Sequence, residues 1–436
     1  MASSRLTAAK LLIRMEEGSY SNILLDRELS LSDLSAEDKR FVSRLFYGVI
    51  ERKNTLDHII SRYLSKPIRK LDTEVLTVLR IGIYQLFYMS VPDNAAVNEC
   101  VNAVKKLRRT SAASMVNAVL RNFIRDGKKL ILPENFSERL SIEYSCPLWL
   151  TNKWIDEYGS ENTEDMLKSS VKAKGVTLRV NPLKTTGEEL TKCLEKTGNS
   201  VKTADFSDLC LKLDNFTDVS SSEYYKKGYF HVQDTASQLC CMALAPQNGD
   251  TVIDVCSAPG GKAFTLAQMM NSEGRVYALD LHENRVRLID EGAKRLGIKN
   301  ITTGVSDAAV FNDSLPVADK ILCDVVCSGL GVIGKKPEIK YKNPDELKTL
   351  PEMQYNILCT SAQYLRVGGE LVYSTCSLSR EENDDVIDRF LREHENFEGV
   401  SFLEELGEPF GEYKATLFPR FFGSDGFFIS KIRRIG

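Results

Sequence analysis

The chain has 436 residues, a formal net charge of −3, 43% hydrophobic residues and 27% charged residues, all ordinary values for a water-soluble globular protein. Its length predicts about three domains at roughly 150 residues each, and no apolar stretch approaches the ~20 residues of a membrane-spanning helix. The eleven cysteines occur without a recognisable secretion signal. This pattern favours reduced thiols, so we expect a cytoplasmic protein that does not contact a membrane.

The sequence has few candidate metal ligands. Its four histidines are scattered over unrelated segments, and its cysteines do not form two Cys-x-x-Cys pairs. Neither a zinc site nor histidine-based acid–base catalysis is therefore expected.

Charge is distributed unevenly along the chain. Residues 1–140 carry 23 Lys and Arg against 16 Asp and Glu, whereas the remainder carries 34 against 44. A basic amino-terminal region is typical of proteins that bind a polyanion such as nucleic acid. An ordinary solvated surface would give the same balance, and charge alone does not separate the two interpretations.

Residues 1–140 are predicted to form an all-α bundle, with no strand-like alternation between the helices. The segment Met1–Met15 has the apolar spacing of a first helix rather than the composition of a transit peptide. Asp72 and Ser35 are predicted helix N-caps, each followed by apolar residues at helical spacing. Clustered basic residues of this region are candidates for binding the phosphates of a polyanion: Lys66, Arg69, Lys70, Lys105, Lys106, Arg108 and Arg109.

Residues 141–232 have a mixed pattern that predicts a small α+β connector. Trp149 and Trp154 lie on an amphipathic helix, and the apolar run 176–182 ends in proline as a strand does. A second helix is predicted over 187–198.

From residue 233 to 436 strands and helices alternate, which predicts a doubly wound, Rossmann-like α/β domain. The expected strands are Thr251–Val255, Arg275–Asp280, Ile301–Gly304, Asp319–Asp324, Glu370–Thr375 and a final one over 426–432. The expected helices are Lys262–Met270, Asn284–Leu296, Asp345–Leu365 and Glu381–Glu393.

A glycine turn follows the first of these strands, at Asp254–Lys262. Glycines let the backbone approach a ligand closely, and the amides at the start of the next helix face it. The turn lacks the Gly-x-Gly-x-x-Gly spacing of dinucleotide binders, which disfavours a nicotinamide cofactor. Asp280, Asp307 and Asp324 follow the next three strands, where an acid can hold ribose hydroxyls. Taken alone, Asp280 is equally compatible with a helix cap.

Two cysteines, Cys327 and Cys376, each follow an apolar strand-like run. In an open parallel sheet, residues just past the carboxyl ends of strands line the ligand crevice. Two thiols beside a cofactor turn therefore favour nucleophilic chemistry. The alternative is that each is a small buried hydrophobe, the commonest fate of a free cysteine, and it applies more strongly to Cys327. Cys256, Cys323 and Cys359 lie within apolar patterns that favour the core.

Together these motifs resemble those of S-adenosylmethionine-dependent RNA cytosine-C5 methyltransferases. The resemblance extends upstream through Arg179-Val180-Asn181 and Gln233–Ser237, and downstream to Asp425–Phe428. The helical region resembles NusB-type RNA-binding domains in the segments Tyr47–Val49, Arg80–Leu86 and Val116–Asn122. This fusion is similar to the Sun/RsmB branch, whose members methylate a cytosine of bacterial small-subunit (16S) ribosomal RNA.

The resemblance implies a domain order and a site. The expected domains are a NusB-like domain (1–140), the connector (141–232) and a methyltransferase domain (233–436). Cys376 is implied as the attacking thiolate, Asp324 as the group that holds the pyrimidine edge, and Cys327 as an aid to proton removal or product release. The residues implied to bind S-adenosylmethionine are Cys256, Ser257, Ala258, Pro259, Gly260, Gly261, Lys262, Asp280, Asp307 and Asp324.

The implied reaction follows from the chemistry of cytosine. Its C5 atom is a poor nucleophile, and addition of a thiolate to C6 turns C5 into an enamine carbon that can attack a methyl sulfonium. The target must be unstacked or single-stranded, because a base inside a duplex is not accessible at C6. A monomer that acts on 16S rRNA without a metal is expected.

One position departs from the family pattern, and three alternatives remain. Val326 stands where the family has proline, which leaves the placement of Cys327 less certain. The chain could act on another RNA such as tRNA, or serve as a non-catalytic RNA-binding assembly factor. An amino-methylating enzyme is disfavoured because its usual Pro-Pro-Tyr/Phe loop is missing after Asp324.

Overall fold

The computed structural model describes residues 4–16, 21–172, 175–214, 216 and 219–436. The chain divides into two compact units. The helical unit contains Met1–Val171 and the short segment Lys336–Tyr341, and the second unit contains Lys172–Lys335 and Lys342–Gly436. The domain boundaries expected near residues 140 and 232 stay predictions.

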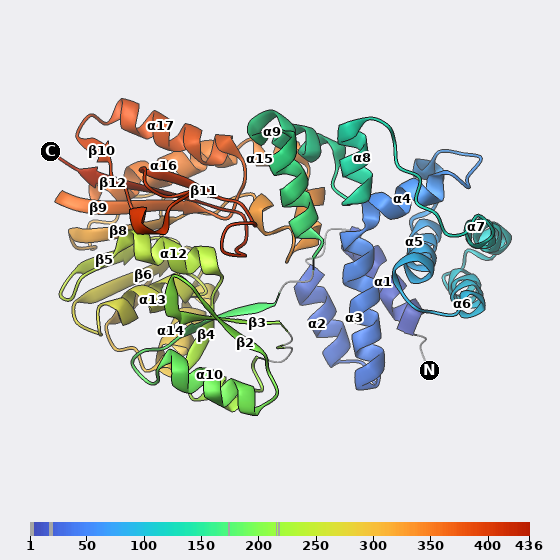
Figure 1. Cartoon of the computed structure of the whole chain (residues 1–436), viewed down its shortest axis with the longest axis horizontal. Helices are drawn as coiled ribbons and strands as arrows, with labels where there is room; N and C mark the ends of the chain where they lie inside the picture. The colour runs from blue at the N-terminus through green and yellow to red at the C-terminus, as the bar shows by residue number, and fades with distance from the viewer. Residues whose placement is uncertain (1–3, 17–20, 173–174, 215, 217–218) are drawn as a thin grey trace. The chain divides into compact units, whose positions relative to one another are not determined.

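The helical unit is an all-α bundle, as predicted, and it is built around one buried helix (Figure 1). Helix α5 (Thr73–Tyr88) buries eleven of its residues, from Val75 to Leu86, because it is apolar on nearly all sides. The other helices of this unit are α1 (Ser4–Glu16), α2 (Ser21–Ser30), α3 (Ala36–Glu51), α4 (Lys53–Ser61), α6 (Asp93–Lys106), α7 (Ala113–Arg125), α8 (Phe136–Glu143) and α9 (Leu148–Ser170).

A paired arginine lies inside this bundle. Arg80 of α5 is 7% exposed and donates two hydrogen bonds to the Asp57 carboxylate, at 2.6 and 2.8 Å. Its third contact is Glu16, at 2.9 Å. Because a buried charge is tolerated where it is paired, this arginine is structural rather than available to RNA.

The helical unit also includes a segment that the chain contributes from far downstream. The 3₁₀ turn Pro337–Tyr341 packs with α3, and the buried Lys340 donates to the carbonyl oxygen of Glu51 at 2.7 Å. Burial lowers the pKa of Lys340 to about 8. This segment follows the Cys327 loop in sequence.

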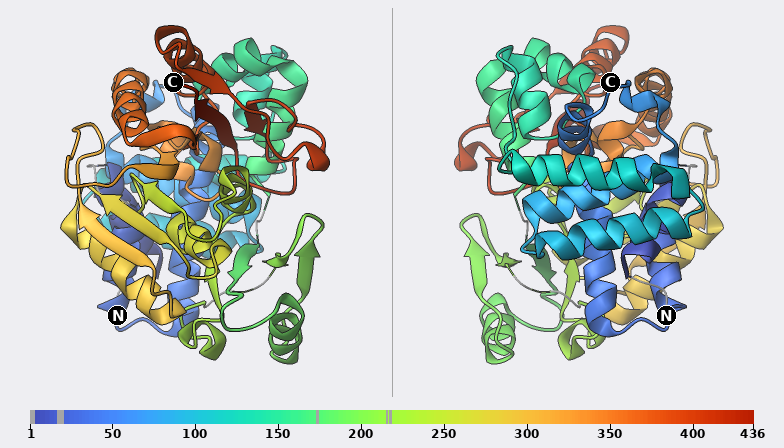
Figure 2. Two further views of the ribbon diagram at one scale, coloured as in Figure 1. Left: turned by 90° about the vertical axis from the view of Figure 1, so that its left-hand side faces the viewer. Right: turned by 90° about the vertical axis from the view of Figure 1, so that its right-hand side faces the viewer.

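The second unit contains a small antiparallel sheet with strand order β2-β3-β1-β4 (Figures 1 and 2). Its strands are β1 (Val176–Val180), β2 (Val201–Ala204), β3 (Ser207–Leu213) and β4 (Phe230–Val232). Helix α10 (Gly187–Lys196) begins with a capping box of Thr186 and Glu189, and its Leu190 and Leu194 pack into the core of this sheet. The predicted α+β character of this region is confirmed.

The large sheet has the strand order β10-β12-β9-β8-β5-β6-β7, with β11 paired to β12. Strands β5 to β9 run parallel, and the strands at the β12 end run antiparallel. Strand order reverses between β5 and β8, so the crevice for a ligand lies at their carboxyl ends. The strands are β5 (Thr251–Asp254), β6 (Arg275–Asp280), β7 (Ile301–Val305), β8 (Ala318–Asp324), β9 (Leu365–Thr375), β10 (Phe397–Gly399), β11 (Lys414–Leu417) and β12 (Phe427–Arg434).

Helices cover both faces of the large sheet, which gives the predicted Rossmann-like layering (Figures 1 and 2). One face carries α12 (Thr235–Leu244), α13 (Gly261–Met269) and α14 (Glu283–Leu296). The other face carries α16 (Leu350–Gln363) and α17 (Asp384–Glu393).

Three local predictions need correction. The helix expected over Asp345–Leu365 is divided into a short α15 (Pro344–Leu347) and α16, and Leu365 already begins β9. The helix expected over Glu381–Glu393 starts as a 3₁₀ turn, because the non-helical backbone of Asn383 separates that turn from α17. Asp72 occupies its N-cap position without a side-chain cap; its carboxylate lies 3.6 Å from Arg109 instead. Ser35, by contrast, caps α3 as predicted, because it accepts from the Asp38 amide.

Candidate active site

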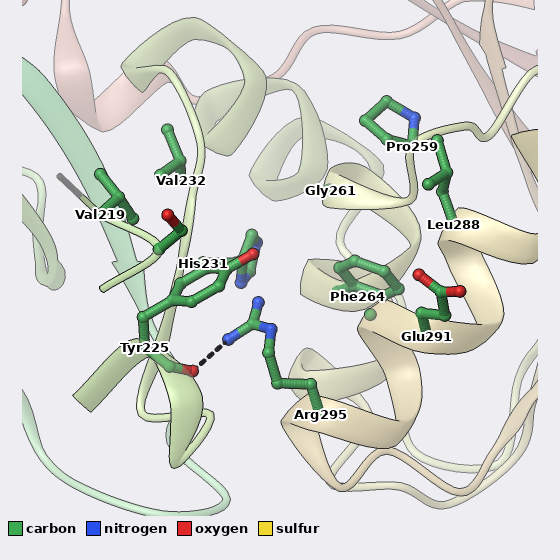
Figure 3. Close-up of a pocket in the computed structure, with 12 residues that line it drawn as sticks. Val219, Tyr225, His231, Val232, Pro259, Gly261, Phe264, Leu288, Glu291 and Arg295 are labelled. Atoms are coloured by element: carbon green, nitrogen blue, oxygen red, sulfur yellow. Dashed lines mark hydrogen bonds between the residues drawn. The ribbon is translucent and has the colours of Figure 1, made fainter. Parts of the chain in front are cut away.

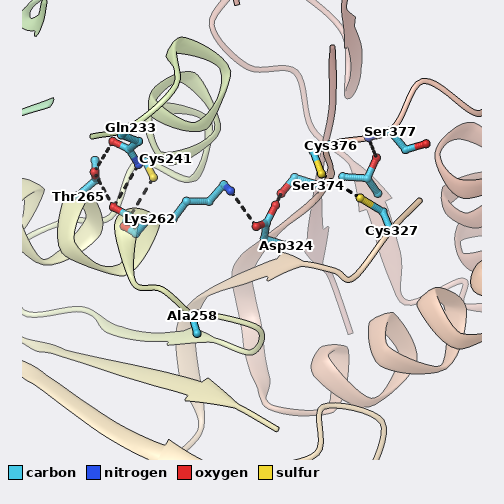
Figure 4. A network of polar contacts seen from close by, with 12 residues as sticks. Gln233, Cys241, Ala258, Lys262, Thr265, Asp324, Cys327, Ser374, Cys376 and Ser377 are labelled. Carbon is cyan, nitrogen blue, oxygen red and sulfur yellow. Dashed lines mark hydrogen bonds and ion pairs between the residues drawn. The ribbon is translucent and has the colours of Figure 1, made fainter. Parts of the chain in front are cut away.

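The two predicted cysteines lie together at the carboxyl ends of neighbouring strands. Asp324 and Ser374 are register partners of the parallel strands β8 and β9, so the chain leaves both strands at the same edge. Cys376 follows directly after β9, and Cys327 follows β8 by three residues. Their Sγ atoms are 3.1 Å apart (Figure 4). Val326 therefore does not prevent the close approach of Cys327 to Cys376.

Asp324 is held between a cation and a hydroxyl at the end of β8 (Figure 4). Its Oδ2 lies 2.8 Å from Lys262 Nζ, and its Oδ1 accepts from Ser374 Oγ at 2.7 Å. Burial lowers the pKa of Lys262, but Asp324 more than offsets this effect, and the pKa is raised overall. Lys262 and Asp324 therefore form a stable ion pair. Each carboxylate oxygen of Asp324 keeps a lone pair that can accept a hydrogen bond from a substrate.

The glycine turn is fixed by hydrogen bonds to β6 and by the packing of Gly260. Ser257 donates its amide to Leu279 O at 2.7 Å, and the Ala258 amide contacts Asp280 Oδ2 at 3.3 Å. Gly260 has a φ of +105°, and a Cβ there would lie 2.4 Å from the Phe264 ring. Glycine is therefore required at this position both by backbone conformation and by packing.

Asp254 is fully buried beside the glycine turn, where the Ser257 hydroxyl and the Cys256 amide approach its carboxylate without a hydrogen bond of ordinary geometry. Both of its carboxylate oxygens and the Ser257 hydroxyl lack a hydrogen-bond partner among the residues that the structure describes. Burial, and next the charge of Asp324, raises the pKa of Asp254 from 3.8 to about 7. Buried polar atoms left unsatisfied beside a glycine turn are typical of a site that a polar ligand completes. The residues present thus fit a nucleoside-like ligand that carries hydroxyls and a positive charge.

The other residues predicted to bind the cofactor differ in exposure. Asp280 is buried and accepts the His282 amide at 3.2 Å. His282 occupies the N-cap position of α14 without a side-chain cap, so the alternative interpretation of Asp280 as a helix cap is wrong. Asp307 is exposed beyond β7. Cys323 lies fully in the core, and Cys256 and Cys359 pack partly buried against it.

Lys335 links the two segments at the ends of the motif pattern, residues 233–237 and 425–428. Lys335 Nζ lies 2.8 Å from Asp234 Oδ2 and 2.7 Å from Asp425 Oδ2, and the Asp425 amide donates to Asp234 Oδ1 at 3.1 Å. Nearby, Gln233 donates to the carbonyl oxygen of Gly261 at 3.1 Å (Figure 4). These contacts tie the segments 233–237 and 425–428 to each other, and Gln233 ties the first of them to the glycine turn.

A separate cavity of about 510 Å³ lies against α13 and α14 (Figure 3). The Arg295 guanidinium stacks 3.7 Å from the Tyr225 ring centroid and donates to Tyr225 O at 2.7 Å. Pro259 and Gly261 of the glycine turn border this cavity, whereas Cys327 and Cys376 do not. The cavity therefore reaches the glycine turn but not the two cysteines.

Most of the basic residues predicted to bind RNA are exposed on the helical unit. Lys66, Arg69, Lys70, Lys105, Lys106 and Arg108 are all solvent-exposed. Arg109 differs, because it lies 3.0 Å from Glu74 and so is already paired. The phosphate contacts stay predictions for all of them.

Comparison with known proteins decides the family. A family model described as 16S rRNA methyltransferase RsmB/F matches residues 241–433, a ferredoxin-like domain of RsmF/B-like methyltransferases matches 146–220, and the NusB family matches 2–125. The Bacillus subtilis (strain 168) protein named Probable ribosomal RNA small subunit methyltransferase B is 37% identical, covering 100% of this chain and 99% of that protein. This chain belongs to the RsmB/F family. A relative from Escherichia coli O1:K1 / APEC, named Ribosomal RNA small subunit methyltransferase B, is 31% identical over 96% of this chain and 95% of its own length.

Solved structures share the fold of this chain. The crystal structure of PH0851 is similar over 100% of this chain and 99% of its own, with a TM-score of 0.83 and 26% identity. A methyltransferase homolog protein from Pyrococcus horikoshii covers 70% of this chain, and all of its own, with a TM-score of 0.60 and 28% identity. In the part of the chain that the structure describes, no helix has the length and apolarity to cross a bilayer, and no cluster of three metal-ligating side chains occurs.

Proposed function

We propose that this chain methylates C5 of a cytosine in 16S ribosomal RNA, through a transient bond between Cys376 Sγ and C6. The observation that carries the proposal is the 3.1 Å contact of Cys327 and Cys376 beside Asp324, at the ends of adjacent parallel strands. The RsmB/F membership and the names of the relatives support the choice of RNA.

Cys376 is the group that we assign to the attack. Its Sγ adds to C6 of the flipped-out base and makes C5 electron-rich, which the free base is not. The carboxylate of Asp324 accepts hydrogen bonds at the polar edge of the pyrimidine ring while Lys262 and Ser374 fix its orientation. The base is then held with C6 toward the sulfur.

Cys327 is suited to act after the attack. Its contact with Cys376, followed by burial, raises the pKa of the Cys327 thiol well above its usual range. A thiol that keeps its proton can donate a hydrogen bond to a thiolate at Cys376 before the attack. Once C5 carries the methyl group, a base removes the C5 proton, the electrons of the C–H bond form the C5–C6 double bond, and the C6–Sγ bond breaks to release Cys376 as a thiolate. The Cys327 thiol, 3.1 Å away, can donate a hydrogen bond to that departing thiolate.

The glycine turn and the acids of the crevice would hold S-adenosylmethionine. This group supplies an electrophilic methyl on a sulfonium sulfur. Asp280 is placed to accept hydroxyls, and the buried Asp254 and Ser257 have the unsatisfied polar atoms that a bound nucleoside would complete. We further propose that the exposed basic residues of the NusB-like helices bind the RNA backbone in the bacterial cytoplasm.

The proposal is tested by methyl transfer to purified 16S rRNA followed by bisulfite sequencing. A methyl group on cytosine C5 protects that base from bisulfite deamination, so one protected cytosine is expected per rRNA. Transfer to tRNA alone would favour the other RNA substrate. S-adenosylmethionine binding without any transfer would favour the non-catalytic assembly factor.

A further inference from the structure

Both cysteine loops share one buried carboxylate, that of Glu382. This side chain belongs to the 3₁₀ turn Arg380–Glu382 after β9 and is 3% exposed. Its Oε1 accepts from Ser328 Oγ at 2.5 Å and from Ser377 Oγ at 2.6 Å. Its Oε2 accepts from the Ser328 amide at 2.8 Å and from Gln354 Nε2 at 3.0 Å. Four donors therefore converge on one carboxylate, which uses its full accepting capacity.

The donors occupy corresponding positions in the two loops. Ser328 is the residue directly after Cys327, and Ser377 is the residue directly after Cys376. Their hydroxyl oxygens are 2.8 Å apart, a spacing that matches the 3.1 Å between the two sulfurs. Glu382 thus holds both loops at the residue next to each sulfur, through the amide and hydroxyl of Ser328 and through the hydroxyl of Ser377.

Two further contacts tie Glu382 to the same loops. Gln354 uses its amide nitrogen to contact the carbonyl oxygen of Val326 at 3.0 Å as well as Glu382, so the loop is held on both sides of Cys327. The carbonyl oxygen of Glu382 accepts from the Tyr373 hydroxyl at 2.7 Å, which anchors the turn to β9. Among the described residues, no lysine, arginine or histidine forms an ion pair with Glu382. Its orientation is therefore set by hydrogen bonds from the cysteine loops and from Gln354.

We propose that Glu382 is the positioning residue of this site, which holds the two sulfurs at the separation that attack and release both require. The inference rests on the proposed function, because it assigns both steps to Cys376 and Cys327. Glu382 acts through the two serines and does not touch the substrate. Loss of the accepting oxygens of Glu382 loosens both loops at once. Loss of one serine hydroxyl loosens only the loop that contains that serine.

Glu382→Gln tests this assignment with little change in shape. The substituted amide places a donor where two donors already converge, so one loop must move. The matched control is Glu381→Gln, at the neighbouring exposed position. The probe is a 16S rRNA transcript that contains 5-fluorocytosine, whose fluorine blocks loss of the C5 substituent and so accumulates the Cys376 adduct.

We expect adduct formation by Glu382→Gln to slow by about 10- to 100-fold, the range for small misplacement of a reacting group. Binding of S-adenosylmethionine and RNA should stay within about 2-fold of the wild type, so that kcat falls while KM does not. Glu381→Gln should behave as the wild type. Full-rate adduct formation in Glu382→Gln would overturn the proposal, as would a loss confined to RNA binding.

Two further variants keep the test decisive. If Glu382→Gln does not fold, the double variant Ser328→Ala with Ser377→Ala removes both hydroxyl donors and should give the same loss of kcat. A double variant that reacts as fast as the wild type would overturn the assignment. Cys376→Ala separates failure of the inference from failure of the proposed function. An active Cys376→Ala overturns the function itself, whereas an inactive one beside a fully active Glu382→Gln overturns the positioning role alone.

Discussion

The Sγ atoms of Cys327 and Cys376 lie 3.1 Å apart, within reach of a disulfide after a movement of about 1 Å. Because the thiolate form reacts with peroxide, we predict that hydrogen peroxide inactivates the enzyme reversibly. The thiolate of one cysteine is oxidised to a sulfenic acid with release of hydroxide, and the second thiol displaces water to form the disulfide.

Mass spectrometry under non-reducing conditions measures this outcome. A loss of ~2 Da per chain, with recovery of activity in dithiothreitol, is expected for the wild type and for a Cys359→Ser control. Hydrogen peroxide should also inactivate Cys327→Ser, but this variant cannot form the intramolecular disulfide. Inactivation of the wild type that dithiothreitol does not reverse would count against the predicted pair chemistry.

Cys327→Ala separates attack from release. Because Cys376 is still present, the adduct should form, but its resolution should slow, so a protein–RNA band shifted on a denaturing gel is expected to accumulate. The double variant Cys327→Ala with Cys376→Ala is the control and should give no band. Normal turnover by Cys327→Ala without any adduct would show that Cys327 is structural.

Asp254 gives a prediction about stability and pH. Its pKa rises from 3.8 to about 7 on folding, so the folded state resists ionisation of this group. The unfavourable contribution is absent below pH 3.8, grows as the pH rises toward 7 and is complete above it, where it reaches up to about 4 kcal/mol. Asp254→Asn should therefore increase the free energy of unfolding of the cofactor-free protein at pH 8, by about 1–3 kcal/mol.

Urea unfolding at pH 8 and pH 5 measures the effect. The gain from Asp254→Asn should shrink at pH 5, and affinity for S-adenosylmethionine should fall at both values. Asp307→Asn, at an exposed carboxylate, should show no such pH-dependent gain. A destabilised Asp254→Asn at pH 8 would mean that the buried carboxylate has a stabilising partner.

Lys105 and Lys106 at the end of α6 test the role of the helical unit. If both contact phosphates, the double substitution to alanine weakens RNA binding and reduces the slope of log affinity against log salt by about 1.4 to 1.8. Arg109→Ala should change the slope less, because Glu74 already binds its guanidinium at 3.0 Å. Filter binding at roughly 50 to 300 mM salt, a range that includes physiological ionic strength, measures the slope for each variant and for the wild type. Equal slopes for the double variant and the wild type would place the RNA elsewhere.

The sequence predicted the elements that bring the site together. The alternation of strands and helices placed Asp324 and Cys376 at strand ends, and parallel pairing of β8 with β9 follows from that alternation. Helix ends were less predictable. Asn383 and Pro351 lie where segments predicted as continuous helices are divided, because local backbone geometry overrides the helical spacing of their apolar residues.

The support behind the cysteines could not be predicted in the same way. Glu382 occupies a position where a charged residue usually faces solvent, and only the meeting of two loops reveals its four donors. Its neighbours Ser328 and Ser377, each next to a cysteine, were the available signal. The segment Lys336–Tyr341 has no helical spacing, so its place in the helical unit depends on tertiary contacts alone.

The most direct test identifies the atom that bonds to the RNA. The wild-type protein is incubated with S-adenosylmethionine and a 5-fluorocytosine-containing 16S rRNA transcript, digested with nuclease and protease, and sequenced by mass spectrometry. We predict a single methylated fluorocytosine nucleotide attached to Cys376. Attachment to Cys327, or full methyl transfer by Cys376→Ala on ordinary rRNA, would contradict the account.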